Sequence, residues 1–430
     1  MRSAPFPLDP ALWAATAPPA PPTPALRESI STDVAIVGGG YLGLSCALHL
    51  AERGVRATVL EAHEPGWGAS GRNGGQVIPG LKHDPDEVIA MFGPERGEAL
   101  TAFAGSTADV VFDLIARHRM DVPHVRAGWL QGAHTDATLD VARRRAEQWA
   151  ARGAPVEITD AARTAAIMGV ETYRGGWVDQ RAGAIQPLAY ARGLARAALA
   201  AGAAIHGGTR VERLVQDGPR WHLDTVAGPR VTADRVVLAT NAYVGDLWPG
   251  MRQTLVPMNS FLIATAPLSD NVRRTILPEG HVSSDTRKLL LYLRLDADGR
   301  LLVGGRGYFT EPSGPASWAH LDRALAKLFP QATGTPITHR WCGRLAVTTD
   351  YLPHLHEPAP GLLIDAGCQG RGVALQSALG RAIATYIATQ DADALPLPVT
   401  PLRGIPFHRF HQAYVSALVA WYRVLDRFGA

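Results

Sequence analysis

The sequence predicts an α/β fold in which a parallel, Rossmann-like βαβ core is joined to a second domain built on an antiparallel sheet (α+β). Three observations predict it: a short apolar run entering a glycine-rich turn and a helix, a second glycine-bearing turn before a late helix, and β-type alternation between the two. With 430 residues, 47% of them hydrophobic, the chain can bury the cores of more than one domain.

Regular structure is expected to begin after Ile30, because the preceding arm is rich in proline, which fixes backbone angles and removes hydrogen-bond donors. A strand at 33–37, a helix at 42–53 that stops before Gly54, and a strand at 57–60 make a complete βαβ unit. The pattern over 85–151 is mainly helical, with short strands expected between 122 and 132, and a further helix is expected at 186–201.

The later elements are mainly strands. Strand-like runs occur at 204–214, 221–226, 235–240, 255–265, 288–295 and 300–304, and Asp298-Gly299 predicts a hairpin turn. A helix at 320–329, a strand at 361–365 and a helix from Val373 to about Thr389 follow. The segment 407–428 predicts an amphipathic helix, whose aromatic stripe we interpret as packing surface in preference to a membrane anchor.

These elements predict four parts of the chain. Residues 1–30 form a Pro-rich arm; 31–90, 150–250 and 342–390 form a discontinuous nucleotide-binding domain; 91–149 and 251–341 form a substrate domain; and 391–430 form a helical extension.

Composition argues against several classes of partner. The net charge of +3 is spread without blocks of like charge, so electrostatics supports neither a nucleic-acid nor a lipid-headgroup partner. Cys46, Cys342 and Cys368 lie far apart without CxxC spacing, which indicates neither disulfides nor a metal site. We expect no transmembrane segment and no signal peptide, and hence a cytoplasmic protein.

Gly38, Gly40 and Gly43 form a GxGxxG motif directly after a strand and at the start of a helix. The first glycine permits the tight turn, the second lets the backbone approach a pyrophosphate, and the third lets helix and strand pack closely. Tyr41 and Leu42 begin the helix, whose free N–H groups and dipole favour a phosphate. The motif in this context predicts a bound dinucleotide.

Glu61 ends the second strand, 18 residues after Gly43, where a carboxylate accepts hydrogen bonds from a ribose 2′-hydroxyl. A carboxylate there also repels a 2′-phosphate, so NADP is disfavoured. The cofactor is then NAD or FAD. The long small-residue loop from Gly66 to Gln76 favours FAD, because a flat flavin ring must lie against backbone and small side chains.

At this point the chain resembles the D-amino acid oxidase family of FAD enzymes and, within it, the branch typified by gamma-glutamylputrescine oxidoreductase. The resemblance spans nearly the whole length. It is carried by residues 33–41, the loop at 69–76, Ala239 to Tyr243, Tyr292 to Arg294, Gly304 to Gly307, Trp341 to Asp350, and Gly367 to Val373. It implies an FAD-binding Rossmann-like domain of the glutathione-reductase type with an antiparallel-sheet substrate domain.

The resemblance also implies roles for individual residues. Ser70 and Arg72 would meet the pyrophosphate, and Val211 would hold the adenine through its backbone. N–H groups at a helix start can stabilise negative charge at the N1 and O2 edge of the flavin. The residues implied to lie along the flavin or at this edge are Asn73, Gly74, Gly75, Gln76, Gly370, Arg371, Gly372 and Val373.

Relatives that oxidise sarcosine attach the flavin to a cysteine, but Cys342 falls one place from that position, which Gly343 occupies. We therefore predict non-covalent FAD and a buried, structural Cys342. The same relatives have a lysine where this chain has Ala374, a departure that favours a polyamine-like or gamma-glutamylated amine over a simple amino acid.

The expected reaction is transfer of a hydride from the carbon beside an amine nitrogen to flavin N5, leaving an imine that water hydrolyses to an aldehyde or keto product. Oxygen, giving hydrogen peroxide, or another acceptor would reoxidise the flavin. The catalytic side chain is not identified, since a dry pocket that binds the neutral amine would suffice. The candidate pocket residues are Gln76, Tyr292, Arg294 and Trp341.

Lys82 and Lys288 are possible oxygen-activating cations, although we favour solvated surface lysines. Three alternatives to an amine oxidase stay open. The first is a D-amino acid or other amino-acid dehydrogenase that passes electrons to a quinone; the second is a non-catalytic flavin- or nucleotide-binding protein; and the third is an NAD dehydrogenase.

Overall fold

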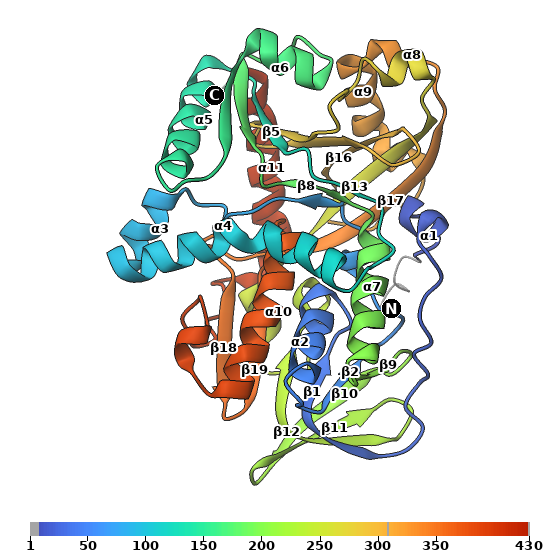
Figure 1. The fold of residues 1–430 in the computed structure, drawn as a ribbon, viewed down its shortest axis with the longest axis vertical. Coiled ribbons are helices and arrows are strands. Elements are labelled where there is room, and N and C mark those ends of the chain that lie inside the picture. Colours follow the sequence, from blue (N-terminus) through green and yellow to red (C-terminus); the bar gives the residue numbers. More distant parts are fainter. Residues whose placement is uncertain (1–7, 308, 429–430) are drawn as a thin grey trace.

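The computed structural model describes residues 8–307 and 309–428, which form two large sheets with helices packed around them (Figure 1). The first sheet has a parallel centre, in which β1 pairs with β12 and β2, β2 pairs with β9, and β12 pairs with β19. Its strands are β1 (Ile30–Val37), β2 (Ala57–Leu60), β9 (Ala204–His206), β10 (Val211–Asp217), β11 (Arg220–Thr225), β12 (Arg230–Leu238), β18 (His354–Ala359) and β19 (Leu362–Ala366).

The predicted βαβ unit is confirmed, with α2 (Tyr41–Ala51) between β1 and β2. β1 and β2 are buried on both faces, as expected of strands in the middle of a parallel sheet. The helix α10 (Gly372–Thr389) packs closely on α2: a Cβ at Gly380 would lie 2.6 Å from the carbonyl oxygen of Leu42. The two glycine-bearing turns that precede these helices are thereby brought together.

The second sheet has the strand order β17-β13-β16-β15-β14-β5-β7-β6 and is antiparallel except where β14 pairs with β5. The predicted hairpin at Asp298-Gly299 joins β15 to β16. Strands β6, β7, β14 and β17 were not expected from the sequence. The members are β5 (Trp129–Ala133), β6 (Val156–Asp160), β7 (Gly175–Asp179), β13 (Val256–Pro267), β14 (Val282–Asp285), β15 (Leu291–Leu295), β16 (Arg300–Arg306) and β17 (Ile337–Val347).

A three-stranded sheet, β3-β8-β4, links the two halves. The helices around them differ in length from four residues to twenty-four. Bounds not yet given are β3 (Gln76–Val77), β4 (His124–Val125), β8 (Gly183–Ile185), α3 (Pro85–Phe92), α4 (Pro94–Arg117), α5 (Asp136–Ala150), α6 (Ala161–Met168), α7 (Pro187–Ala200), α8 (Asp270–Arg273), α9 (Ala319–Leu328) and α11 (His411–Phe428).

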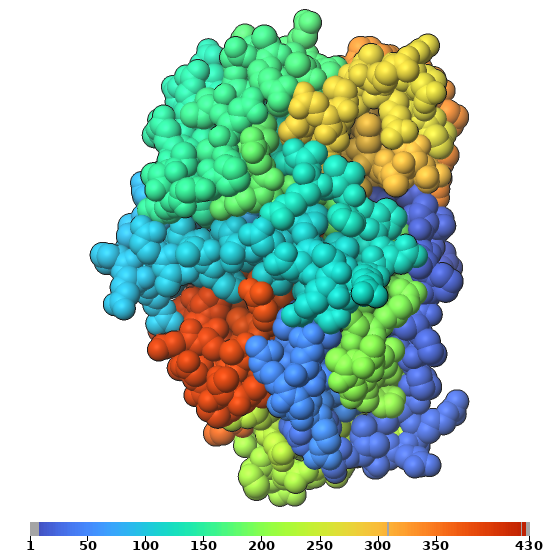
Figure 2. Space-filling model, viewed as in Figure 1, coloured from blue at the N-terminus to red at the C-terminus, as the bar shows by residue number. Residues whose placement is uncertain are grey.

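Three elements, α4, β6 and β7, lie in a different part of the fold from the one that the predicted domain bounds imply. We assigned 91–149 to the substrate domain, but α4 packs on α10 and its apolar side chains join the core of the first sheet's helices. We assigned 150–250 to the nucleotide-binding domain, but β6 and β7 belong to the second sheet. In Figure 2 the segment containing α4 crosses the face of the molecule as a belt between its two halves. The rest of the domain division stays a prediction.

Among the described residues, α4 is the helix whose length and apolar composition would allow it to cross a membrane. Of its most apolar 18-residue window, 61% is buried inside the protein. The apolar character of α4 is therefore explained by its position in the core.

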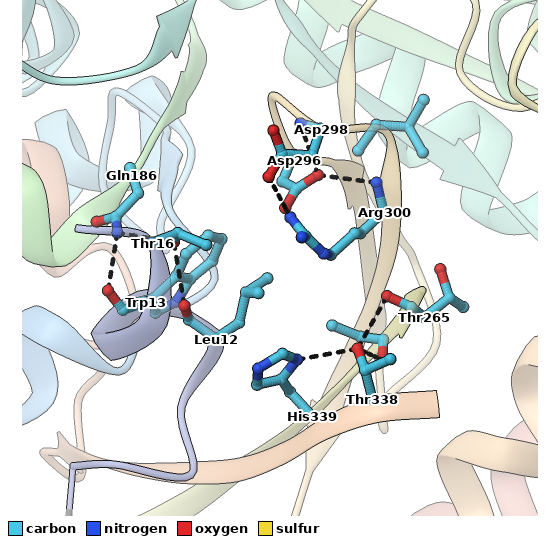
Figure 3. A network of polar contacts seen from close by, with 12 residues as sticks. Leu12, Trp13, Thr16, Gln186, Thr265, Asp296, Asp298, Arg300, Thr338 and His339 are labelled. Carbon is cyan, nitrogen blue, oxygen red and sulfur yellow. Dashed lines mark hydrogen bonds and ion pairs between the residues drawn. The ribbon is translucent and has the colours of Figure 1, made fainter. Parts of the chain in front are cut away.

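The prediction that structure begins after Ile30 is wrong. Residues 12–16 form the short helix α1, and Leu12 and Trp13 are almost completely buried. The Gln186 side chain donates hydrogen bonds from Nε2 to the Trp13 carbonyl and to Thr16 Oγ1 (Figure 3). Between Pro10 and Pro18 the arm has an apolar, proline-free stretch, and its docking surface could not be seen from local sequence.

Candidate active site

A cavity of about 1570 Å³ lies between the first and second sheets. It begins at the carboxyl ends of β1 and β2, where ligands bind in open α/β sheets, and continues past the loop at 66–76 to strands β13–β16 and the helix α11. Its volume exceeds that of an ordinary small-ligand pocket. The cavity is therefore large enough for a dinucleotide together with a second small molecule.

The first glycine turn is built as the motif predicts. Gly38 has φ +112°, and a Cβ there would lie 2.8 Å from the carbonyl oxygen of Ala239. A Cβ at Gly43 would lie 2.0 Å from the carbonyl oxygen of Gly38, and one at Gly40 would lie 3.0 Å from Ser70 Oγ. Gly38 and Gly43 therefore have to be glycine, and the backbone of the turn borders the cavity at Gly38 and Gly40.

Glu61 lies beside this turn at the end of β2. Its Oε2 accepts a hydrogen bond from the Gly39 N–H at 2.7 Å, and its Oε1 accepts one from the His63 N–H at 2.9 Å. Burial raises the pKa of the carboxyl, although the backbone N–H groups of Gly39 and His63 oppose that change. The carboxylate is held in place at the cavity wall, as a ribose-binding acid must be.

The loop at 66–76 is held by its own polar groups and by Tyr41 of α2. Ser70 Oγ accepts from the Tyr41 N–H at 3.0 Å, and the Tyr41 hydroxyl donates to the Ser70 carbonyl at 2.6 Å. Asn73 Nδ2 donates to the Ser70 carbonyl at 2.9 Å, and Asn73 Oδ1 accepts from the Gly75 N–H at 2.8 Å. The Tyr41 and Asn73 side chains thus shape the loop, whose backbone then borders the cavity.

Arg294 does not line the cavity, contrary to expectation. Its guanidinium lies behind the loop, where Nη1 donates to the carbonyls of Ile185 at 2.6 Å and Gly75 at 3.1 Å. Burial lowers the pKa of Arg294 to about 10. Its role in the structure is to hold the loop.

Trp341 is also behind the loop and outside the cavity. It is fully buried, packs edge-on against Trp13 with 5.9 Å between ring centroids, and donates from Nε1 to the Arg72 carbonyl at 2.9 Å. The other two pocket candidates do border the cavity. Gln76 donates from Nε2 to the Ser283 and Leu293 carbonyls, each at 3.0 Å, and the Tyr292 hydroxyl lies 2.8 Å from Ser260 Oγ.

The second glycine turn also borders the cavity. Gln369 and Gly370 have positive φ, and the backbone then enters α10 at Gly372. The long helix directs its N-terminal N–H groups and positive dipole end toward this wall. Two buried oxygens on the cavity wall, Asn241 Oδ1 and Gln369 Oε1, accept no hydrogen bond from any described residue.

These features fit FAD. The two turns offer backbone N–H groups, glycines leave the space that a Cβ would fill, and the unsatisfied oxygens of Asn241 and Gln369 can accept hydrogen bonds from a bound flavin nucleotide. Among the predicted cofactor residues, Gly43 and Gly75 do not border the cavity. Those that do are Gly38, Gly40, Tyr41, Leu42, Glu61, Ser70, Arg72, Asn73, Gly74, Gln76, Val211, Gly370, Arg371, Gly372 and Val373.

Lys82 is exposed, as expected of a solvated lysine, but it borders the cavity and does not lie on the outer surface alone. Its side chain meets solvent inside the cavity, and within the described residues its ammonium makes no ion pair or hydrogen bond. Burial, with the charges of Arg371 and Arg145, lowers the pKa of Lys82 to about 8. Lys288 is exposed and borders the same cavity near α11.

Cys342 is buried, as predicted, and burial raises its pKa to about 11. It borders a separate small hollow with Arg72 and Tyr243, whereas Gly343 and Cys368 border the main cavity. The absence of a covalent flavin bond stays a prediction. In the described part of the chain no group of three His, Cys, Asp or Glu side chains could hold a metal ion.

Sequence analysis did not single out several residues of the second sheet that border the cavity, including Trp129, Gln131, Ser284 and Arg306. Each lies in a strand whose alternation was detected only in part, or in β5 and β14, whose pairing joins segments far apart in sequence. Alternation shows which side chains share a face but not which face borders a ligand.

A dinucleotide-binding α/β domain with a flavin-sized cavity against an antiparallel sheet defines an FAD-dependent oxidoreductase. The family model described as FAD dependent oxidoreductase (DAO) matches residues 33–386. The chain belongs to this family, and FAD is its cofactor.

Two relatives extend over almost the whole chain. A probable oxidoreductase OrdL from Rhizobium meliloti is 32% identical over 97% of both chains. A gamma-glutamylputrescine oxidoreductase from Escherichia coli is 33% identical over 94% of this chain and 96% of its own. Among solved structures, glycine oxidase from Geobacillus kaustophilus superposes with a TM-score of 0.72 at 24% identity, covering 87% of this chain and all of its own, which supports the shared fold.

Proposed function

We propose that this protein oxidises an amine that also carries a carboxylate, of the gamma-glutamylputrescine type, to an aldehyde. The observation that carries the proposal is the distribution of charge along the cavity. Three acids border it: Glu61 directly follows β2, Glu212 lies in β10, and Asp246 lies in the segment between β12 and β13. The described residues that border the cavity from the second sheet and α11 include no acid.

Cations border this acid-free part of the cavity. Lys82, Lys288 and Arg306 all reach it, and among the described residues none of the three forms an ion pair. An unpaired cation in a partly enclosed site favours an anionic ligand group. A plain polyamine would meet repulsion there, whereas the carboxylate of a gamma-glutamylated amine would meet attraction. The curated relative named gamma-glutamylputrescine oxidoreductase supports the same choice.

When bound, FAD supplies the hydride acceptor for the carbon beside the amine nitrogen, and water hydrolyses the resulting imine. The chain's own residues bind and orient the substrate. Lys82 would hold the carboxylate, and Tyr292, with Gln76 beside it, would shape the wall near the flavin loop. Because the Tyr292 hydroxyl is already paired with Ser260, it supplies a fixed surface. Apolar neighbours such as Leu262 limit water and favour the neutral amine.

We propose oxygen as the electron acceptor. A primary amine would then react with one molecule of oxygen and one of water to give an aldehyde, ammonia and hydrogen peroxide.

The test mixes the FAD-loaded protein, without oxygen, with gamma-glutamylputrescine, putrescine or glycine. The loss of the oxidised flavin's blue absorption is then followed. We expect rapid bleaching by the gamma-glutamylated amine and peroxide on admitting air. Equal or faster bleaching by putrescine would refute the substrate class, and aldehyde without peroxide would refute oxygen.

A further inference from the structure

The helix α11 has apolar residues on two sides but packs on the protein with only one. Val415 is buried, and Tyr422 borders the cavity. A second set recurs every three or four residues and lies on the solvent side of the helix, although Tyr414 and Leu418 also reach the cavity edge. This outer stripe consists of Phe410 (50% exposed), Tyr414 (41%), Leu418 (38%), Trp421 (57%) and Val424 (42%), with Phe407 (77%) just before it.

The orientation of α11 is fixed by polar contacts on its packed side. The Asp426 carboxylate accepts hydrogen bonds from the backbone N–H groups of Lys288 at 2.7 Å and Leu289 at 2.9 Å. Just before the helix, His408 Nε2 lies 2.8 Å from the Leu255 carbonyl, to which it can donate. The exposed stripe is therefore not the result of a helix that has failed to dock (Figure 1). Five large apolar side chains in a row on a surface mark a binding face.

The charge around the stripe indicates what binds it. Arg403 and Arg409 are exposed beside the start of the helix, and the sole acid of the segment 403–428 is Asp426. The Asp426 carboxylate is occupied by the two backbone N–H groups, and the exposed Lys288 adds a further positive charge beside it. The small net charge of the whole chain conceals this local excess.

We propose that α11 is a membrane-surface helix, which lies in the headgroup region of an anionic bilayer with its outer stripe inserted among the lipids. Aromatic and aliphatic side chains flanked by arginine are the pattern of interfacial helices. Arginines near an anionic surface each add attraction. A second copy of this chain is a poorer occupant, because pairing the stripes would bring the arginines of both copies together. The bilayer would also lie beside the part of the cavity that Tyr414 and Leu418 border.

The test is sedimentation of the full-length, FAD-loaded protein with vesicles of phosphatidylcholine alone or with added phosphatidylglycerol, at low and high salt. We expect binding to the anionic vesicles that weakens with salt. The triple variant Phe410→Ser/Trp421→Ser/Val424→Ser should reduce binding about tenfold or more, since it removes the inserted apolar groups. Ile158→Ser, at an apolar residue 47% exposed on β6, is the matched control and should bind as the unmodified protein does.

A second variant, Arg403→Gln/Arg409→Gln, leaves the apolar stripe intact and should weaken binding to anionic vesicles while preserving the flavin spectrum. If the triple variant does not fold, vesicle binding by this double variant tests the proposal. The proposal is overturned if the unmodified protein stays in solution with anionic vesicles at low salt, or if both variants sediment as it does. It is also overturned if the unmodified protein does not bind vesicles and is a dimer, whereas the triple variant is a monomer.

Discussion

The indole Nε1 of Trp341, on β17, donates a hydrogen bond to the backbone carbonyl of Arg72 at 2.9 Å. This contact joins the second sheet to the loop that the sequence assigns to the flavin. Trp13 packs against the same indole edge-on, so the contact is also tied to the N-terminal arm. Residues that face away from the cavity therefore determine the shape of its wall.

Replacing Trp341 by Phe should remove that hydrogen bond and weaken FAD binding several-fold, because the Arg72 carbonyl is left without its partner. The free energy of unfolding should fall by about 1 kcal/mol. Trp221→Phe is the matched control, since Trp221 is equally buried and donates from Nε1 to the Pro360 carbonyl at 3.2 Å, outside the cavity. Equal FAD dissociation constants for the two variants would contradict the role assigned to Trp341.

Gly43→Ala should abolish FAD binding or prevent folding, because the new Cβ would lie 2.0 Å from the Gly38 carbonyl oxygen. Gly54→Ala is the comparison. Gly54 has φ +76° and no atom within 4 Å of the new Cβ, so the cost should be confined to backbone strain of about 1 kcal/mol. Flavin absorbance after purification and thermal unfolding check both. A Gly43→Ala protein that retains full FAD would show that the turn is not built as described.

Lys82→Met should raise KM for carboxylate-bearing amines by tenfold or more and should change the pH profile. With the pKa of Lys82 lowered to about 8, the ammonium is present below that pH and is lost as pH rises through it. For the native protein kcat/KM should therefore decline above about pH 8, and the variant should lack this decline. Lys288→Met, at the exposed lysine, should retain it. If kcat/KM still declines above that pH in the Lys82→Met variant, the decline is caused by another titrating group.

Asp365→Asn should stabilise the protein at neutral and alkaline pH. Asp365 is 1% exposed, its Oδ2 has no hydrogen-bond partner among the described residues, and burial raises its pKa to about 7. From about pH 4 to about pH 7 the unfolded chain is ionised while the native carboxyl stays protonated, so native stability falls as pH rises through this range. At pH 8 the variant should gain roughly 2–4 kcal/mol. Denaturant unfolding at pH 4 and pH 8 measures this, and an equal effect at both values would contradict it.

The sequence predicted the parts of the site that depend on local chain geometry. The GxGxxG turn, Glu61 at the end of β2 and the turn at Gly370 are each recognised within one strand–turn–helix unit. Hydrophobic periodicity predicted most helices and strands, because it too depends only on residues close together in the sequence.

The rest of the site depends on contacts between distant segments. Arg294 and Trp341 were expected in the pocket, but their partners Ile185 and Arg72 are 109 and 269 residues away in sequence. Nothing local distinguishes a side chain that borders a cavity from one that supports its wall. The position of the exposed Lys82 on the cavity could not be predicted for the same reason, since a lysine in a loop after a two-residue strand resembles any surface residue.

The central claim is that the acid-free part of the cavity selects an amine by its carboxylate. It is tested most directly by the second-order rate constant of anaerobic flavin reduction, compared between gamma-glutamylputrescine and the same molecule with its carboxylate converted to an amide. The account predicts a reduction at least tenfold slower for the amide, with a much smaller difference in Lys82→Met. Equal rate constants for the two compounds with the native protein would contradict it.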